Sequence, residues 1–232
     1  MRSASAIRTS QVLIVLALLA IVPCMAGGTP PRGIGSQWLV IGDDDPPRVI
    51  PPSPACTVNE AVLHDQLRLT FENELLWTRM VAMGVLHDIE GHDVYLKRLS
   101  ENYEAFEEAL VPIYGPSAEK IGALLTEHVG LTSQVVHEIF AGMDFASTLP
   151  NWYKNGEQIA GSLSALNPRF WPADEMSMHW KIYLDDILNG SLAFYRNDWT
   201  TDVIMLDTLH RDCLGMADYM TAGIVQQCAG TK

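Results

Sequence analysis

Five side chains of the kinds that bind metals or transfer protons recur at matching positions along the chain. They are Glu74, His128, Tyr183, Asp207 and His210. Carboxylate, imidazole and phenolate groups are ligands for iron, zinc and manganese in proteins. Helical bundles build such sites from inward-pointing side chains on facing helices. We therefore predict that these five residues form a polar cluster able to hold a divalent transition metal (Fe, Zn or Mn) or a small ligand.

The spacing that would bring these residues together is helical. In four segments, the residues at alternating steps of four and three form a stripe whose most polar members lie in its middle third. Within the last stripe, Asp207 and His210 are three residues apart and so lie on one helix face. The stripes span residues 67–85, 121–139, 176–194 and 203–221.

The predicted cluster has three interpretations. Buried acids and imidazoles are costly unless they are partnered, so the first is a closed polar network in which imidazoles bond to carboxylates. The second is a bound metal or small ligand, and the third is catalysis. Di-iron bundle proteins carry Glu-x-x-His on two helices, a motif that this chain lacks; the segment from Asp207 to His210 is a shortened variant. The chain also has no nucleophile elbow, phosphate loop or dinucleotide fingerprint.

The same helical periodicity, which begins after Cys56, locates the helices that must position these residues. No segment alternates with a period of two, so we predict no sheet. Short connections favour antiparallel neighbours, and the fold class expected is all-α: an antiparallel bundle of four long helices with two additional short ones, over residues 56–228. Long helices are expected at about 57–88, 117–143, 172–195 and 200–227, and short ones at about 93–110 and 151–166.

The first 55 residues lack this periodicity. Residues 1–26 are typical of a secretory signal peptide, with a basic start, an apolar run over 12–22 and cleavage near Ala26. The apolar run is short for a spanning helix, which needs about 20 residues, so an uncleaved membrane anchor is the less favoured alternative. Five Gly and seven Pro in residues 27–55 predict a flexible linker. Residues 229–232 are a short tail, and the protein is expected to be secreted.

Charge limits the possible partners. The chain has 28 acidic and 15 basic residues, which gives a formal net charge of −13 at pH 7. Binding to nucleic acid requires a basic face, so we exclude a nucleic-acid partner. An acidic surface keeps an exported protein in solution and, at most, indicates cations as partners.

Export would permit two kinds of covalent modification. Disulfides persist outside the reducing cytosol. In an up-and-down bundle with an even number of long helices, Cys56 and Cys228 lie at the same end, so we expect them to form a bridge. Cys213 lies about four turns earlier on the last helix and is expected to be a buried free thiol; the alternatives are three free thiols or a Cys56 bridge between chains. An Asn-Gly-Ser triplet makes Asn189 a glycosylation acceptor if the host is eukaryotic and the site is exposed.

Four short stretches carry a likeness to known proteins. They are Leu76-Trp77-Thr78-Arg79, Leu124-Leu125-Thr126-Glu127-His128, Asn167-Pro168 with Trp171, and Gly215-Met216-Ala217-Asp218-Tyr219-Met220. Through them, residues from about 65 to 227 resemble a family of bacterial helical-bundle proteins of unknown function. The resemblance implies the fold, and His128 matches a family histidine. The family tends to place histidines where this chain has Glu74 and Tyr183, and some members carry a glycosyltransferase label that no nucleotide-sugar fold in this chain supports.

These observations favour a secreted binding or structural protein that holds a metal ion or a small ligand inside its bundle. One alternative is a metal-dependent hydrolase or oxidoreductase that uses the same cluster. Another is a protein-interaction module that uses the outer faces of its helices. An open coordination position beside a solvent pocket would favour the enzyme, whereas an exposed apolar patch would favour the interaction module.

Overall fold

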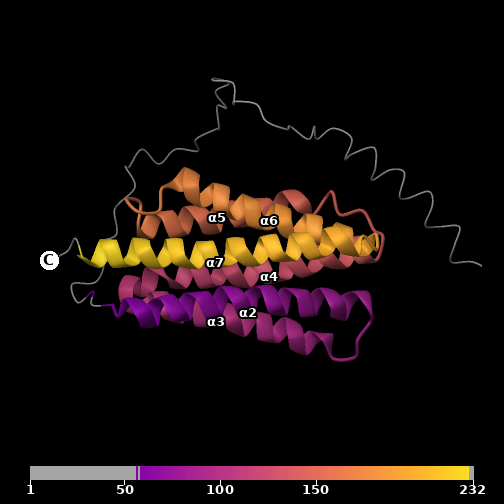
Figure 1. Ribbon diagram of the computed structural model, residues 1–232, viewed down its shortest axis with the longest axis horizontal. Coiled ribbons are helices and arrows are strands. Elements are labelled where there is room, and N and C mark those ends of the chain that lie inside the picture. Colours follow the sequence, from indigo (N-terminus) through magenta and orange to yellow (C-terminus); the bar gives the residue numbers. More distant parts are fainter. Residues whose placement is uncertain (1–55, 57, 230–232) are drawn as a thin grey trace, which may run out of the picture. The chain divides into compact units, whose positions relative to one another are not determined.

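The computed structural model of the protein describes residue 56 and residues 58–229, where every regular element is a helix (Figure 1). The all-α prediction is confirmed, since no strand occurs within these residues. The predicted signal peptide and linker lie outside the described residues, as does most of the tail. The helices are α2, Glu60–Leu86; α3, His92–Tyr114; α4, Glu119–Phe140; α5, Leu149–Leu166; α6, Ala173–Tyr195; and α7, Trp199–Ala229, with a short 3-10 turn, Gly115–Ser117, between α3 and α4.

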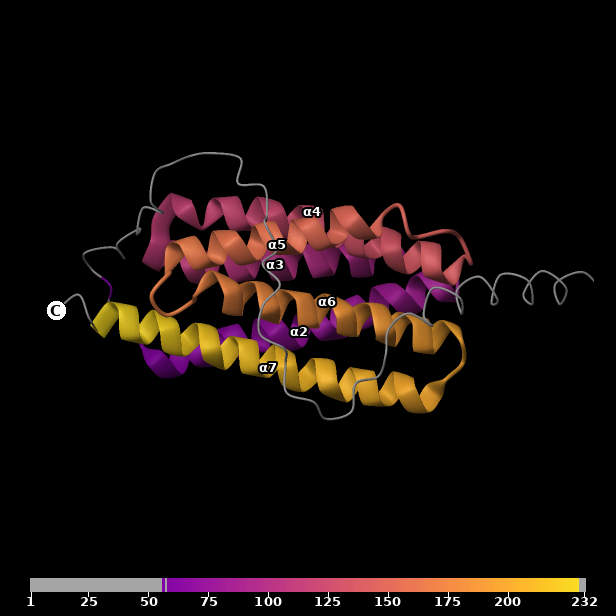
Figure 2. The same ribbon diagram turned by 90° about the horizontal axis from the view of Figure 1, so that it is seen from above.

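Successive helices run in alternating directions and lie side by side (Figures 1 and 2). Each helix contacts the next one along the chain, and α7 contacts α2, so the series closes on itself. Further contacts of α4 with α2 and with α6 cross the interior. Because the loops are short, neighbours in the chain must pack antiparallel. None of the helices in the described part of the chain is both long and apolar enough to cross a membrane.

The predicted division into four long and two short helices is wrong at α3. This helix has 23 residues, the same number as α6, and ends at Tyr114 rather than near Leu110. Pro112 lies inside its last turn, where a proline removes one backbone donor and disturbs little of the helix. Gly115 follows with φ 58°, a conformation that favours glycine, and it ends α3. At the N-terminus of α2, Asn59 caps the helix, because its side chain accepts a hydrogen bond from the backbone N–H of Val62.

The core forms along the predicted stripes of α2, α4 and α6, but not along the first half of the stripe predicted for α7. All six stripe residues of α4 are buried, from Ile121 to Ile139. Trp171, in the loop before α6, is fully buried and packs against Gly223 of α7 so closely that any Cβ there would overlap the indole ring. Tight helix packing of this kind is what makes core positions sensitive to changes in volume.

Four of the side-chain pairs that join α2, and Cys56 just before it, to α7 are spaced along the whole contact. Along α2 the pairs advance toward its C-terminus, while along α7 they move back toward its N-terminus, as an antiparallel contact requires. The pairs are Cys56–Cys228, Arg68–Asp218, Glu72–His210 and Arg79–Asp202. We call this contact the α2–α7 seam.

The predicted cysteine pairing is confirmed. Cys56 and Cys228 form a disulfide with their Cα atoms 5.3 Å apart, across 172 residues of sequence. Cys213 is buried and stays a free thiol, also as predicted. Six alternating helices place the two termini of the bundle at one end for the same reason that four would. Asn189 is exposed on α6, and its glycosylation stays a prediction.

We expect the bridge to stabilise the fold strongly, because it closes most of the chain into one loop. Replacing both Cys56 and Cys228 by Ser should lower the free energy of unfolding by about 2–4 kcal/mol in urea denaturation. Cys213→Ser is the matched control, and it should leave the bridge intact in non-reducing peptide mapping. Recovery of a Cys56–Cys213 peptide from the wild-type protein would contradict this topology.

Candidate functional site

A buried carboxyl group lies where α2, α3 and α6 meet. Glu74 points inward from the middle of α2 and is 4% exposed. Its Oε1 atom accepts hydrogen bonds from the hydroxyl groups of Tyr103 on α3 and Tyr183 on α6. None of the ion pairs in the described residues involves Glu74. Among the residues that the structure describes, Glu74 is therefore a buried acid with two phenol donors and no cation paired to it.

Burial governs the ionisation of these groups. It raises the pKa of the Glu74 carboxyl, because water no longer solvates the charge, and the two tyrosine hydrogen bonds offset part of that rise. Burial also raises the pKa of Tyr103 and of Tyr183 well above the ordinary phenol value, and the neighbouring carboxyl raises both further. Both tyrosines therefore stay protonated and remain hydrogen-bond donors.

A cavity of about 370 Å³ opens beside this carboxyl group, between α2, α6 and α7. Its mouth meets the solvent at Ile182, Arg211 and Gly215, which are exposed. Ligand sites in proteins have this size and combine apolar walls with a few polar groups. The deep part of the cavity is lined by Phe71, Glu74, Trp180, Tyr183, Cys213 and Met216.

The pKa of the Cys213 thiol depends on the burial of this cavity wall and on the charged groups near it. Burial raises its pKa well above the ordinary value, and the carboxyl groups of Glu74, Asp212 and Asp186 raise it further. At the mouth, the Nε atom of Arg211 lies 3.8 Å from an Asp212 oxygen, so this cation is partly offset by its neighbour. The charged groups that act on the Cys213 thiol are therefore all acids.

His128 lies in the same interior, on α4, and is 1% exposed. Its Nδ1 atom is 2.8 Å from Oδ1 of Asn155, whose amide nitrogen donates to the Leu124 carbonyl and to Glu127. Because Oδ1 of Asn155 must then accept, Nδ1 of His128 carries the proton and Nε2 is an acceptor. This Nε2 is buried without a hydrogen-bond partner in the described structure.

Aromatic rings surround the His128 imidazole. It stacks on Trp152 with ring centroids 6.2 Å apart, and it meets Trp180 edge to face at 5.6 Å. The ring of Tyr183 is 6.2 Å away, so His128 adjoins the Glu74 group without bonding to it. Burial lowers the pKa of His128 to about 4, and the Asn155 bond offsets only part of that shift. The imidazole is therefore neutral at pH 7.

The structure brings together three of the five predicted site residues. The expectation that Asp207 and His210 join them is wrong, because both are exposed on α7, and His210 pairs with Glu72 at 3.4 Å. The buried side of α7 includes Asp202, one residue before the predicted stripe begins, and one residue turns a helix by about 100°. Within the described residues, no three His, Cys, Asp or Glu side chains form a group that could hold a metal ion.

Sequence reasoning missed three residues of the site. Tyr103 was outside the predicted stripes because α3 was treated as a flanking helix, although its apolar spacing with Leu99 and Phe106 marks it as inward-facing. Trp180 lies in the predicted stripe of residues 176–194, but an apolar ring in a stripe does not by itself indicate a cavity wall rather than the core. Cys213 was expected to be buried, but nothing in the sequence placed it beside Glu74.

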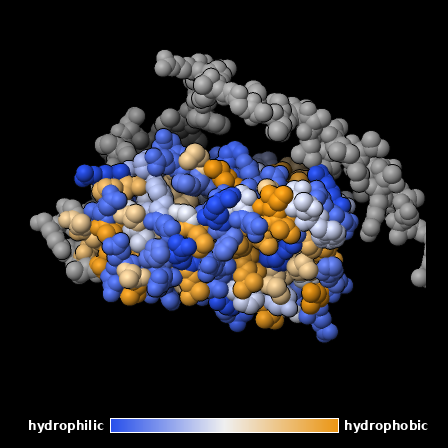
Figure 3. Space-filling view, in the orientation of Figure 1, coloured by the Kyte–Doolittle hydropathy of each residue, from blue (hydrophilic) through white to orange (hydrophobic). Residues whose placement is uncertain are grey.

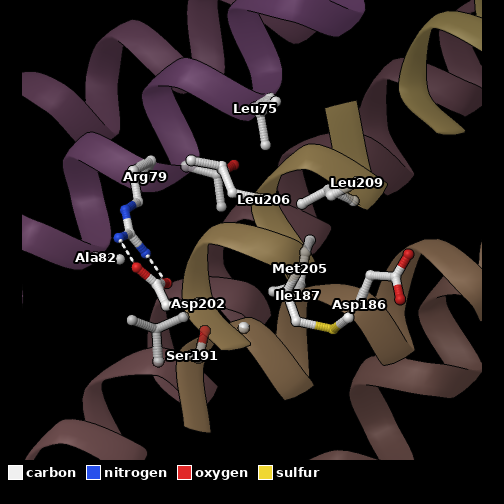
Figure 4. Close-up of a pocket in the computed structure, with 13 residues that line it drawn as sticks. Leu75, Arg79, Ala82, Asp186, Ile187, Ser191, Asp202, Met205, Leu206 and Leu209 are labelled. Atoms are coloured by element: carbon white, nitrogen blue, oxygen red, sulfur yellow. Dashed lines mark hydrogen bonds and ion pairs between the residues drawn. The ribbon is translucent and has the colours of Figure 1, made fainter. Parts of the chain in front are cut away.

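A second cavity lies along the α2–α7 seam and has a different character. Its volume is only about 50 Å³, too small for an organic ligand. Figure 4 shows the guanidinium of Arg79 directed at the carboxylate of Asp202, with two bonds of 2.8 and 2.6 Å. The same guanidinium lies 4.2 Å from the ring centre of Phe194. Asp202 is thus a paired buried acid, in contrast to Glu74.

We expect two Glu74 variants to behave oppositely at neutral pH. Glu74→Ala should lower the free energy of unfolding by at least about 1–3 kcal/mol, because it leaves two buried phenol donors unpaired. Glu74→Gln keeps an acceptor oxygen and removes the charge, so it should be at least as stable as the wild type at pH 7. The pKa of Glu74 is higher in the folded protein than its ordinary value of 4.5, so the protonated group contributes to stability below pH 4.5. This contribution is lost as pH rises through the folded pKa. Urea denaturation should therefore show the Gln advantage vanishing below pH 4.5; an advantage that grows there would contradict the assignment.

We expect His128 to make the fold sensitive to acid. Its folded pKa of about 4 lies below the ordinary 6.5, so its contribution to stability is present above pH 6.5 and is lost as pH falls through about 4. The loss should reach about 3 kcal/mol. His128→Phe keeps an aromatic ring against Trp152 and removes the titration. The unfolding free energy of this variant is subtracted from that of the wild type at each pH, and the difference should fall as pH decreases from 6.5 to about 4. A difference that does not vary with pH would show that His128 is not buried as neutral imidazole.

Comparison with known proteins adds no relationship to this geometry. No model of a protein family, no curated protein and no solved structure matches the chain. The resemblance to bacterial helical-bundle proteins therefore stays an expectation from the sequence. What the cavity does must be argued from the residues that line it.

Proposed function

We propose that this protein is exported and binds a small organic ligand in the cavity between α2, α6 and α7. The observation that carries the proposal is the Glu74 carboxyl group at the floor of that cavity, buried without a cation. A buried acid that lacks a counter-charge lowers the stability of the free protein at neutral pH. A ligand that pairs with the carboxyl group would relieve this cost.

The shape and lining of the cavity support binding. Apolar side chains from three helices form its walls, and Glu74 and Tyr183 supply polar groups at its deep end. This combination provides affinity through buried apolar area and orientation through a few directed hydrogen bonds. Hydrogen bonds from Tyr103 and Tyr183 already hold the Glu74 carboxyl group in place. Such preorganisation reduces the entropy that a ligand must overcome.

The same groups favour binding over catalysis. A reactive cysteine needs a lowered pKa, whereas the pKa of Cys213 is raised by burial and by nearby acids. His128, which lies inside the bundle, bonds to Asn155 rather than to Cys213 or Glu74. The groups at the floor of the cavity are therefore suited to recognition.

The surface gives less support to a protein-interaction module. On the face shown in Figure 3, hydrophilic residues predominate and the hydrophobic ones form small, separate patches. Scattered apolar side chains are normal on a soluble domain and do not by themselves indicate a partner.

We also propose that four of the helices form the principal unit of the bundle and that the protein is exported. We regard α2, α4, α6 and α7 as the principal four-helix unit of the bundle, supported by the contacts of α2 and α6 with both α4 and α7. Export is supported by the signal-like residues 1–26 and by the Cys56–Cys228 bridge, since disulfides persist in oxidising compartments.

Three small aromatic probes of similar size test the proposal: phenethylamine, phenethyl alcohol and phenylacetate. Binding is measured by calorimetry on the mature protein. Gly215→Trp places a bulky side chain at the mouth of the cavity, and Gly161→Trp is the matched control on α5; a Cβ meets no atom within 4 Å at either glycine.

We expect at least one probe to bind to the wild type and to the Gly161 variant. The same probe should bind the Gly215 variant about tenfold more weakly or worse, because the mouth is filled. Equal binding to both variants, or no binding of any probe, would refute a ligand site in this cavity.

A further inference from the structure

We infer that the ligand of this cavity is an organic cation, with an apolar body and a protonated amine that pairs with the Glu74 carboxylate. The inference rests on the proposed function and names the chemical class that the cavity recognises. The observations that carry it are the acid at the floor, the aromatic walls and the sign of the charges nearby.

The walls suit a cation as well as an apolar body. Phe71 of α2 and the rings of Trp180 and Tyr183 of α6 line the cavity together with the carboxyl group. The Trp180 and Tyr183 rings stand nearly perpendicular, at 77°, with centroids 5.5 Å apart. Aromatic faces attract cations, and this attraction strengthens where water is excluded. A carboxyl group among aromatic rings is a common way to bind an amine, because the acid supplies the charge and the rings supply the area.

The charges around the cavity have the sign that a cation requires. The groups that face Glu74 are Tyr103 on α3, Tyr183 on α6 and Cys213 on α7, and none of them is a cation. The wider surroundings include Asp186 on α6, Asp212 and Arg211 on α7, and His179 at the rim.

Only Arg211 in this set is a permanent cation, and it is exposed beside Asp212. The net charge of −13 adds a weak long-range attraction in the same direction. An anionic ligand would meet repulsion from Asp186 and Asp212. In the part of the chain that the structure describes, none of the groups around the cavity is a buried cation that would offset this repulsion.

Binding of a cation couples to the loss of a proton. In the free protein, burial favours the protonated carboxyl group of Glu74. When the ammonium group enters, the Glu74 proton leaves to the solvent and the carboxylate pairs with the cation; no covalent bond to carbon changes. The amine keeps its own charge, because alkylamines titrate near pH 10. Affinity for the amine should therefore rise with pH through the folded pKa of Glu74.

The same three probes separate the cation from the other ligand classes. Phenethylamine should bind about tenfold more tightly than phenethyl alcohol at pH 7, and phenylacetate should bind most weakly. Glu74→Gln should weaken phenethylamine by about tenfold or more and change phenethyl alcohol by less than about threefold. In the wild type, the affinity for phenethylamine should rise with pH while that for phenethyl alcohol stays flat.

The outcomes distinguish the two proposals. If phenethyl alcohol or phenylacetate binds in a way that Gly215→Trp blocks, and phenethylamine has no advantage, then the cavity is a ligand site and the cation inference is overturned. If no probe binds, both proposals fail. If Glu74→Gln does not fold, the pH dependence of the wild type decides, and an affinity for phenethylamine that does not vary with pH overturns the inference.

Discussion

The burial of one carboxyl group is the constraint around which this bundle is arranged. Glu74 sits between α2, α3 and α6, and two tyrosines from different helices donate to the same oxygen. A buried acid with no cation demands such donors, because the alternative is an unsatisfied charge in a medium of low polarity. Tyr103 and Tyr183 satisfy that demand only in part, since the pKa of the carboxyl group stays raised. The fold thus keeps a group whose charge is incompletely compensated, and the space beside it is a cavity.

The cavity exists because α7 is held at a fixed register against α2. Pairs spaced along both helices, from the disulfide at one end to Arg79–Asp202 near the other, allow little sliding. This register places Cys213 and Met216 at the wall of the cavity and exposes His210. Arg79 and Asp202 also show how the same bundle treats an acid whose role is structural: a bidentate cation pairs with it. The contrast with Glu74 is the strongest reason to assign Glu74 a role in recognition.

Helical periodicity predicted much of this arrangement, and the limits of that prediction are physical. The stripes of α2, α4 and α6 placed Glu74, His128 and Tyr183 inside, because the other residues in each of these stripes are mostly apolar. On α7 apolar residues occur on several sides, so the pattern fixed the helix but not its rotation, and Asp207 was placed wrongly. The contact of Tyr103 with Glu74 depends on how two helices pack, which spacing along one chain does not encode.

Carbon-13 NMR of labelled glutamate side chains measures the pKa of the Glu74 carboxyl group in the free protein and in the presence of saturating phenethylamine. We expect the group in the free protein to titrate above the ordinary value of 4.5, because burial disfavours the charge. We expect the bound amine to lower that pKa, because a cation beside the carboxylate favours ionisation. An ordinary pKa in the free protein, or one that saturation with the amine leaves unchanged, would contradict the view of Glu74 as a buried receptor for a cation.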